Sequence, residues 1–104
     1  MTNWTDVLAA AQLPAGGRWL ARREGREIAL FNVGGTLYAI DDSCPHNGAS
    51  LASGRIEGTT VACRAHGLRF DLGSGSMRGG GLQVRTYPVR VHEGRIEIDL
   101  EPAA

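Results

Sequence analysis

The chain has 104 residues, with 11 basic and 11 acidic side chains and therefore no formal net charge. This length holds one domain with a single core, which we expect to span residues 1–104, and the balanced charge does not favour binding to nucleic acid or to an anionic membrane. No apolar run approaches the roughly 18–20 residues that cross a bilayer, and no signal peptide is apparent, so we expect a cytoplasmic protein.

The first half of the chain predicts one short helical turn followed by strands. The alanine-rich stretch Thr5–Leu13 is expected to form the helical turn and to end before Pro14. Two strands, Glu27–Val33 and Thr36–Ile40, flank Gly34-Gly35, a dipeptide that is typical of a tight β-hairpin. This part of the chain therefore predicts antiparallel sheet rather than helix.

The second half predicts further short strands. The segments Gly54–Gly58 and Thr59–Cys63 are expected to pair, Gly67–Leu72 forms another strand, and Val84–His92 turns back into Arg95–Leu100. The last strand alternates apolar with charged residues, the signature of a half-buried strand. Its apolar side chains are expected to meet those of the preceding strand across the sheet: Ile96, Ile98 and Leu100 with Tyr87, Val89 and Val91. The fold class is therefore all-β, with antiparallel sheets.

Four residues carry the chemistry. The only two cysteines and two of the three histidines fall into two short runs, Cys44-Pro45-His46 and Cys63-Arg64-Ala65-His66. Each run brings a thiolate and an imidazole close enough to contact one metal centre, and a glycine follows each, which suits a tight loop. Two cysteines and two histidines in this order indicate a [2Fe–2S] cluster in which histidines replace thiolates on one iron. The third histidine, His92, is expected on the outward side of a strand as a solvated residue.

Three other roles for these residues fit their pattern less well. Zinc takes the same donors, but zinc fingers place two cysteines before two histidines, so a zinc-stabilised β-module is a remote alternative. A disulfide between Cys44 and Cys63 would leave the neighbouring histidines without a role. A nucleophilic cysteine–histidine pair would not need to occur twice. The duplication favours metal ligation.

The two runs lie in longer stretches, Cys44–Leu51 and Cys63–Asp71, that resemble the cluster-binding boxes of Rieske-type ferredoxins. The resemblance covers essentially the whole chain. It implies a small antiparallel β-sandwich or barrel-like fold with a cluster-binding subdomain of two loops at one tip, about residues 42–80. It also implies that Cys44 and Cys63 hold the buried iron. His46 and His66 then hold the outer iron, near the surface.

Four positions distinguish the chain from the high-potential Rieske proteins of respiratory and photosynthetic chains. Those proteins, which this chain resembles, have two extra cysteines that form a disulfide. They also have a serine and a tyrosine that donate hydrogen bonds to the cluster. The corresponding residues here are Ala49, Ala65, Leu68 and Phe70. Because this chain lacks the donors that would stabilise the reduced cluster, we predict a reduction potential of about −150 mV, at the low end of the Rieske range.

The resemblance to the soluble, low-potential branch implies a function. It implies a one-electron carrier that passes electrons from a flavin-containing, NAD(P)H-dependent reductase to a terminal oxygenase acting on aromatic rings. The small subunit of a nitrite reductase, or of another multicomponent oxidoreductase, is the alternative. In either role the chain is not an enzyme by itself.

Three groups of residues near the predicted tip have expected roles of their own. Phe70 and Tyr38 are expected to pack in the core. The glycine-rich segment Ser76–Gly81 is expected to be a flexible cover, if it covers the cluster at all. Three arginines are either ordinary solvated residues or steer an acidic partner: Arg64, Arg69 and Arg78.

Overall fold

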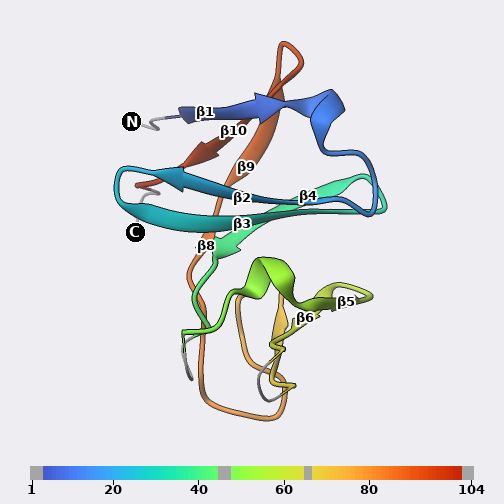
Figure 1. Ribbon diagram of the computed structural model, residues 1–104, viewed down its shortest axis with the longest axis vertical. Coiled ribbons are helices and arrows are strands. Elements are labelled where there is room, and N and C mark those ends of the chain that lie inside the picture. The colour runs from blue at the N-terminus through green and yellow to red at the C-terminus, as the bar shows by residue number, and fades with distance from the viewer. Residues whose placement is uncertain (1–3, 45–47, 65–66, 102–104) are drawn as a thin grey trace.

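The computed structural model describes residues 4–44, 48–64 and 67–101. The molecule measures 38 × 29 × 20 Å, and its described residues form three antiparallel sheets (Figure 1). The first sheet has the order β1 (Trp4–Ala9), β10 (Arg95–Asp99) and β9 (Val89–His92). The second has the order β2 (Arg18–Arg23), β3 (Arg26–Val33), β4 (Thr36–Asp41) and β8 (Thr86–Tyr87). The third has the order β5 (Arg55–Glu57), β6 (Thr60–Ala62) and β7 (Arg69–Asp71).

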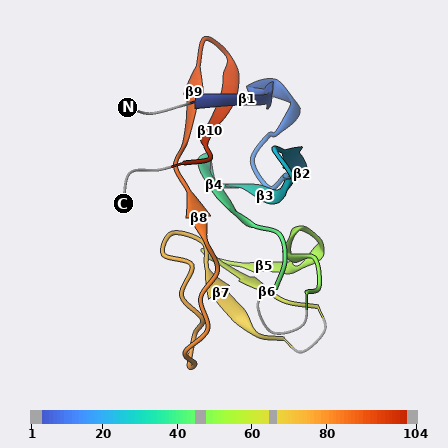
Figure 2. The same ribbon diagram turned by 90° about the vertical axis from the view of Figure 1, so that its left-hand side faces the viewer.

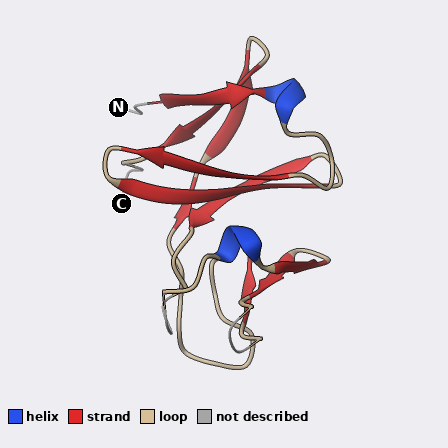
Figure 3. Cartoon of the chain, viewed as in Figure 1, coloured by secondary structure: helices blue, strands red, loops and turns tan. Residues whose placement is uncertain are grey.

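Strands dominate the described residues, with two short 3₁₀ helices, η1 (Ala10–Gln12) and η2 (Leu51–Ser53), between them (Figure 3). The third sheet lies at the opposite end of the molecule from β1 and β10 (Figure 2). Below, residues 44–84, which include this sheet and both predicted ligand loops, are called the tip, and the rest of the chain is called the base. The predicted all-β fold with a tip built on loops is confirmed.

The middle strand β3 is buried on both faces, which explains its unbroken apolar run Ile28–Phe31. Ile28 and Leu30 pack in a base core that fills the space between the first and second sheets. Ala29 and Phe31, which point the other way, pack in a second core. This tip core contains Ala29, Phe31, Ile40, Cys44, Leu51, Ala52, Val61, Cys63, Phe70, Leu72 and Val84. The two predicted ligand cysteines are therefore part of the apolar core that joins tip to base.

A polar contact also joins the two halves. The guanidinium Nη1 of Arg18, at the start of β2, donates to the carbonyl oxygen of Ala52 at 3.1 Å and to that of Gly54. Both carbonyls belong to the η2 turn, which lies between the first predicted ligand loop and β5. The base thus holds the tip through packing and through a charged donor on two backbone acceptors.

Most predicted elements are confirmed. The Gly34-Gly35 hairpin joins β3 to β4, with Val33 opposite Thr36. The two short segments around Gly58 form β5 and β6, and β7 follows the second predicted ligand loop. Phe70 is fully buried and Tyr38 packs against the same core, as expected.

The N-terminal prediction was wrong in part. The helical turn is confined to Ala10–Gln12, and the residues before it form β1, which pairs with β10 and places Leu8 opposite Ile96. A register shift between Asp6 and Leu8 allows the consecutive residues Val7 and Leu8 both to be buried. Burial in the base core therefore overrides the helical preference of the alanine-rich sequence.

The predicted C-terminal hairpin is also modified. Residues 84–92 do not form one strand, because Pro88, which has no amide hydrogen, divides β8 from β9. β8 pairs with β4 in the second sheet, whereas β9 pairs with β10 in the first, so Tyr87 meets the last strand through the base core only. Val91 lies opposite Ile96 as predicted but remains 53% exposed. His92 is exposed, which confirms its expected surface position.

The hydroxyl of Tyr87 should make stability depend on alkaline pH. It donates to Asp41 Oδ1 at 2.5 Å, and burial together with this bond raises the pKa of Tyr87 above its usual 10.0. Because the tyrosine ionises more readily in the unfolded chain, the free energy of unfolding should fall as pH rises above 10. Tyr87→Phe should cost about 1–2 kcal/mol at pH 7 and flatten that alkaline fall.

Urea unfolding at pH 7 and in steps between about pH 9.5 and 11.5 measures both effects. Tyr38→Phe, which also removes one phenol but leaves the bond between Tyr87 and Asp41 in place, is the control. Equal alkaline slopes in the wild-type protein and Tyr87→Phe would contradict the assignment.

Candidate metal centre

The first predicted ligand loop is held at both ends by Asp42. This carboxylate is buried, and its Oδ1 accepts hydrogen bonds from Ser50 Oγ at 2.8 Å and from the amide of Ala52 at 2.7 Å. The backbone of Asp42 donates to the carbonyl of Glu27 at 3.0 Å and accepts from the amide of Leu51 at 2.6 Å. Asp42 therefore fastens the loop entrance to the loop exit and to β3. Sequence reasoning missed this residue, because its partners are defined only by the folded loop.

Cys44 begins a turn whose backbone bonds close on a glycine. The amide of Cys44 donates to the carbonyl of Ala49 at 2.9 Å, and the carbonyl of Cys44 accepts from the amide of Gly48 at 2.7 Å. Gly48 has φ +78°, a conformation that residues with a Cβ rarely adopt. The loop is therefore closed by the backbone around residues 45–47, which lie outside the described part of the chain together with the predicted ligand His46.

Cys63 begins a second turn with the same construction. Its amide donates to the carbonyl of Leu68 at 2.7 Å, and its carbonyl accepts from the amide of Gly67 at 2.8 Å. Gly67 has φ +71°. The predicted ligand His66 is outside the described residues, as is Ala65. In the described ends of both loops, the cysteine and the glycine make the same two backbone hydrogen bonds.

The two loops are thus built on one plan. In both, the glycine comes four residues after the cysteine, although the histidine comes two residues after it in the first loop and three in the second. The cysteine–histidine spacing, on which the predicted ligand set depends, differs between the loops, whereas the cysteine–glycine spacing is equal. This equal spacing is what produces the matching backbone bonds.

The cysteines have the environment that an iron–sulfur centre needs. Cys44 is 1% and Cys63 is 2% exposed, both belong to the tip core, and no disulfide joins them. Thiolates are the protein ligands that iron–sulfur clusters use most, and burial keeps water from such a site. Two cysteines that begin matching loops and lie in one apolar core therefore fit a [2Fe–2S] group.

Gly67 provides a test of the loop geometry. Gly67→Ala would place a Cβ in open space, since no atom lies within 4 Å, so its cost is the left-handed backbone alone, about 1 kcal/mol. We expect that strain to loosen the second loop and to speed loss of bound iron to a chelator several-fold. Gly34→Ala, in the β3–β4 hairpin, also has positive φ and an open Cβ site, so it is the matched control.

Absorbance of the bound group during exposure to a chelator measures the release rate, and urea unfolding measures stability. Gly34→Ala should lose similar stability but keep the wild-type release rate. Equal release rates for the two variants would show that Gly67 has no special part in the loop.

The segment predicted as a flexible cover forms part of a hairpin. Ser76 pairs with Gln83, the amide of Met77 donates to the carbonyl of Leu82 at 3.0 Å, and Phe70 pairs with Met77. The amide of Arg78 donates to the carbonyl of Arg69 at 2.8 Å, so the hairpin extends the tip sheet beyond β7. That this segment covers the cluster stays a prediction.

Comparison with known proteins places the chain in a family. Residues 3–88 match the model of the Rieske [2Fe-2S] domain. The ferredoxin component of a naphthalene 1,2-dioxygenase system from Pseudomonas aeruginosa is 35% identical over 100 residues, which cover 94% of this chain and 96% of the relative.

Two solved structures have a similar fold. One is a complex of reduced oxygenase and oxidised ferredoxin in carbazole 1,9a-dioxygenase, in which the matched chain has a TM-score of 0.89 and 28% identity and the match covers 100% of this chain and 99% of that one. The other is assigned as an NADH-dependent nitrite reductase small subunit from Mycobacterium tuberculosis, with a TM-score of 0.90, 27% identity and 99% of both chains covered.

The matching loops, the buried cysteines and the three-sheet fold define an iron–sulfur β-protein. The chain belongs to the Rieske [2Fe-2S] domain family. Its cofactor is accordingly a [2Fe–2S] cluster. Within the described residues, no helix is long and apolar enough to cross a membrane.

Proposed function

We propose that the protein is a one-electron carrier, the ferredoxin component of an oxygenase system. It receives electrons from a flavin-containing, NAD(P)H-dependent reductase and delivers them to a terminal oxygenase that acts on aromatic rings. The observation that carries the proposal is the pair of matching loops that present Cys44 and Cys63 inside the tip core. Relatives of nearly the same length are ferredoxin components of dioxygenase systems, which supports the carrier role.

The proposed ligands are Cys44 and Cys63 to the inner iron and His46 and His66 to the outer iron. A bound [2Fe–2S] cluster supplies a site that takes up and gives back one electron. The chain supplies the rest. Asp42 and the backbone bonds of the two loops fix the positions of the cysteines, and the tip core excludes water from their sulfur atoms. The proposal treats residues 1–104 as one Rieske domain in the cytoplasm, with its cluster-binding part at about 42–80.

A small subunit of a nitrite reductase is the second candidate. The structure assigned to that role in Mycobacterium tuberculosis matches this chain over nearly its whole length. Both candidates need the same cluster and differ in the acceptor. Reduction of an aromatic-ring oxygenase, compared with reduction of a nitrite reductase catalytic subunit, would separate them.

Electron paramagnetic resonance of the purified protein before and after dithionite tests the proposal, with iron and sulfide assayed on the same sample. We expect a sample that is silent when oxidised and gives a rhombic signal when reduced, with an average g value below that of all-cysteine clusters. A colourless, silent sample that contains zinc, and that takes up no iron and sulfide under anaerobic reconstitution, would overturn it in favour of a zinc-stabilised β-module.

A further inference from the structure

We propose that the redox partner of this protein docks through a carboxylate-rich surface against an arginine face on the tip. The arginine face consists of Arg55, Arg64, Arg69 and Arg78. This inference rests on the proposed carrier function, to which it adds the chemistry of the partner. It follows from the distribution of charge, the register of the tip sheet and the two grooves beside the Cys63 loop.

The charge of the chain is neutral in sum but divided between its two halves. The tip contains four arginines against two acidic residues, Glu57 and Asp71, whereas the base contains seven arginines against nine acidic residues. All 11 basic residues are arginine, whose planar guanidinium binds carboxylates with two parallel hydrogen bonds. The positive end of the molecule is therefore the end that carries the cysteines.

The register of the tip sheet gathers the arginines on its outer face. Arg55 pairs with Ala62, which pairs with Arg69, so the two arginines flank a small residue in one row across three strands. The residues that alternate with this row point inward: Val61 and Phe70 are buried in the tip core, and Ile56 packs against it. Residues far apart in sequence thus form one exposed basic surface.

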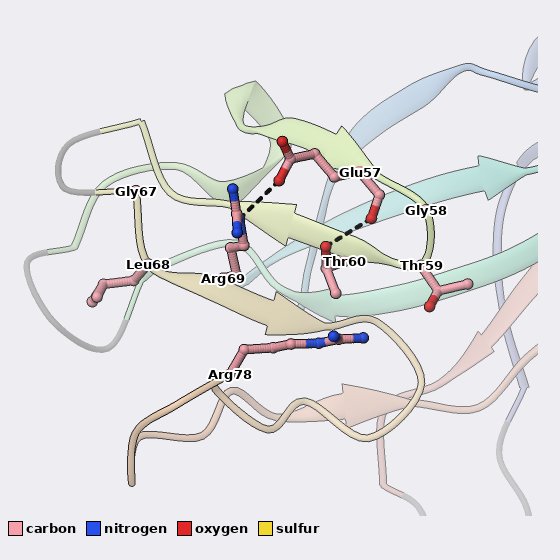
Figure 4. A pocket seen from close by; sticks show the side chains of 8 residues that line it. All are labelled: Glu57, Gly58, Thr59, Thr60, Gly67, Leu68, Arg69 and Arg78. Atoms are coloured by element: carbon pink, nitrogen blue, oxygen red, sulfur yellow. Dashed lines mark hydrogen bonds and ion pairs between the residues drawn. The ribbon is translucent and has the colours of Figure 1, made fainter.

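Two grooves on this face adjoin the second ligand loop. One has a volume of about 570 Å³ and is lined by Thr59, Thr60, Leu68, Arg69 and Arg78, among others (Figure 4). The other has a volume of about 290 Å³ and its lining includes Arg55, Cys63, Arg64 and Arg69. Gly67 lines both. The arginine face therefore begins at the loop that starts with Cys63.

The carboxylates within the tip do not balance this face. Glu57 forms ion pairs with Arg69 at 2.8 Å and with Arg55 at 3.8 Å, so one carboxylate serves two guanidiniums. In Figure 4 its side chain meets Arg69 on one side of Thr60, while Arg78 lies on the other side. Asp71 Oδ2 accepts from the amide and hydroxyl of Ser74, at 2.8 and 3.0 Å. These bonds, and more weakly the charge of Arg78, lower the pKa of Asp71. Among the described residues, no ion pair within 4.0 Å engages Arg64 or Arg78.

The base shows the opposite arrangement. Four of its seven arginines are each paired with one carboxylate across strands or termini: Arg22 with Glu27, Arg26 with Glu101, Arg90 with Glu97 and Arg95 with Asp6. Those pairs neutralise each other locally and leave the unbalanced positive charge at the tip. A partner that approaches the cysteine end of the molecule meets that charge, and a negatively charged surface would be attracted and oriented by it.

Two haem proteins serve as probes: cytochrome b5, whose exposed haem edge is rich in carboxylates, and cytochrome c, whose haem edge is rich in lysines. Their reduction by the reduced holoprotein is followed by stopped flow at ionic strengths of about 20 and 500 mM. The test variant is Arg69→Gln/Arg78→Gln. The matched control is Arg22→Gln/Arg90→Gln, which removes the same two positive charges from ion-paired arginines of the base.

With cytochrome b5, the wild-type rate should fall as salt rises, whereas with cytochrome c it should rise or stay level. The test variant should reduce cytochrome b5 about tenfold more slowly than the control at low salt and equally fast at high salt. Binding of cytochrome b5 to the oxidised protein, measured by chemical-shift titration at low salt, should be weaker for the test variant than for the control. This second readout needs no electron transfer, so it separates the docking proposal from the carrier proposal.

Two results would overturn the docking proposal. One is equal low-salt rates and affinities for the test and control variants, which would mean that net charge alone matters. The other is a faster low-salt reaction with cytochrome c that high salt suppresses, which would assign a basic partner to the tip. If the protein lacks the rhombic signal but still binds cytochrome b5 through the arginine face, the carrier proposal fails, and what remains is a binding face for carboxylate-rich proteins without a redox role.

Discussion

Cys63→Ser is expected to remove the rhombic electron paramagnetic resonance signal and to lower bound iron to the level of the metal-free protein. Cys63 is 2% exposed and starts the second loop, so nothing at the surface can replace its sulfur at this buried position. The hydroxyl of serine is a harder and far less acidic ligand than a thiol. Cys44→Ser should behave identically, because its loop has the same construction.

The same substitutions should also lower thermal stability, because metal binding and folding are coupled when ligands come from separate loops. Iron and sulfide assays, the spin signal and a melting curve measure the effect on each variant. His92→Ala is the control: His92 is the third histidine, it is exposed on β9, and its loss should leave iron and signal unchanged. A full complement of iron in Cys63→Ser, or its loss in His92→Ala, would refute the proposed ligand set.

The features that the sequence predicted are those set by residues close together in the chain. The Gly34-Gly35 hairpin depends on the two glycines between its strands, and the cysteine and histidine of each loop are two or three residues apart. β1 depends instead on Ile96 and Ile98, about ninety residues away, which bury Val7 and Leu8. The helical preference of the local alanine-rich sequence therefore predicted a helix, whereas pairing with the distant strand β10 makes these residues a strand.

The same distinction applies to the site. Asp42 was missed because three of its four hydrogen bonds, those from Ser50, Leu51 and Ala52, exist only after the first loop has closed. Arg64, Arg69 and Arg78 were placed near the tip from sequence, but Arg55 joins them only through the pairing of β5 and β7 with Ala62. A charge pattern of this kind requires the sheet register, which a single sequence does not supply.

The second large effect concerns the reduction potential, which we expect near −150 mV in the wild-type protein. In the high-potential Rieske proteins that this chain resembles, the position of Leu68 is a serine that donates a hydrogen bond to the cluster. The residue directly follows Gly67, is half-buried, and its carbonyl accepts from the amide of Cys63. Leu68→Ser therefore adds a hydroxyl beside the proposed site without changing the backbone bond that closes the loop.

That hydroxyl should stabilise the reduced state, which has one more negative charge to solvate. A hydrogen bond to a charged group stabilises it by about 1–2 kcal/mol more than one to a neutral group, which for one electron corresponds to a rise of roughly 40–80 mV. Phe70→Tyr is the less suitable test. Phe70 is completely buried in the tip core, so the added hydroxyl would also introduce crowding and an extra polar group there.

Leu82→Ser is the matched control, because it makes the same substitution at a leucine that is 37% exposed on the neighbouring hairpin. Protein-film voltammetry or a dye-mediated titration followed by the spin signal measures all three potentials at one pH. Leu68→Ser should lie above the wild-type value and Leu82→Ser within error of it. A wild-type potential above zero would contradict this account, because it would mean that other donors in the tip replace the missing hydroxyls.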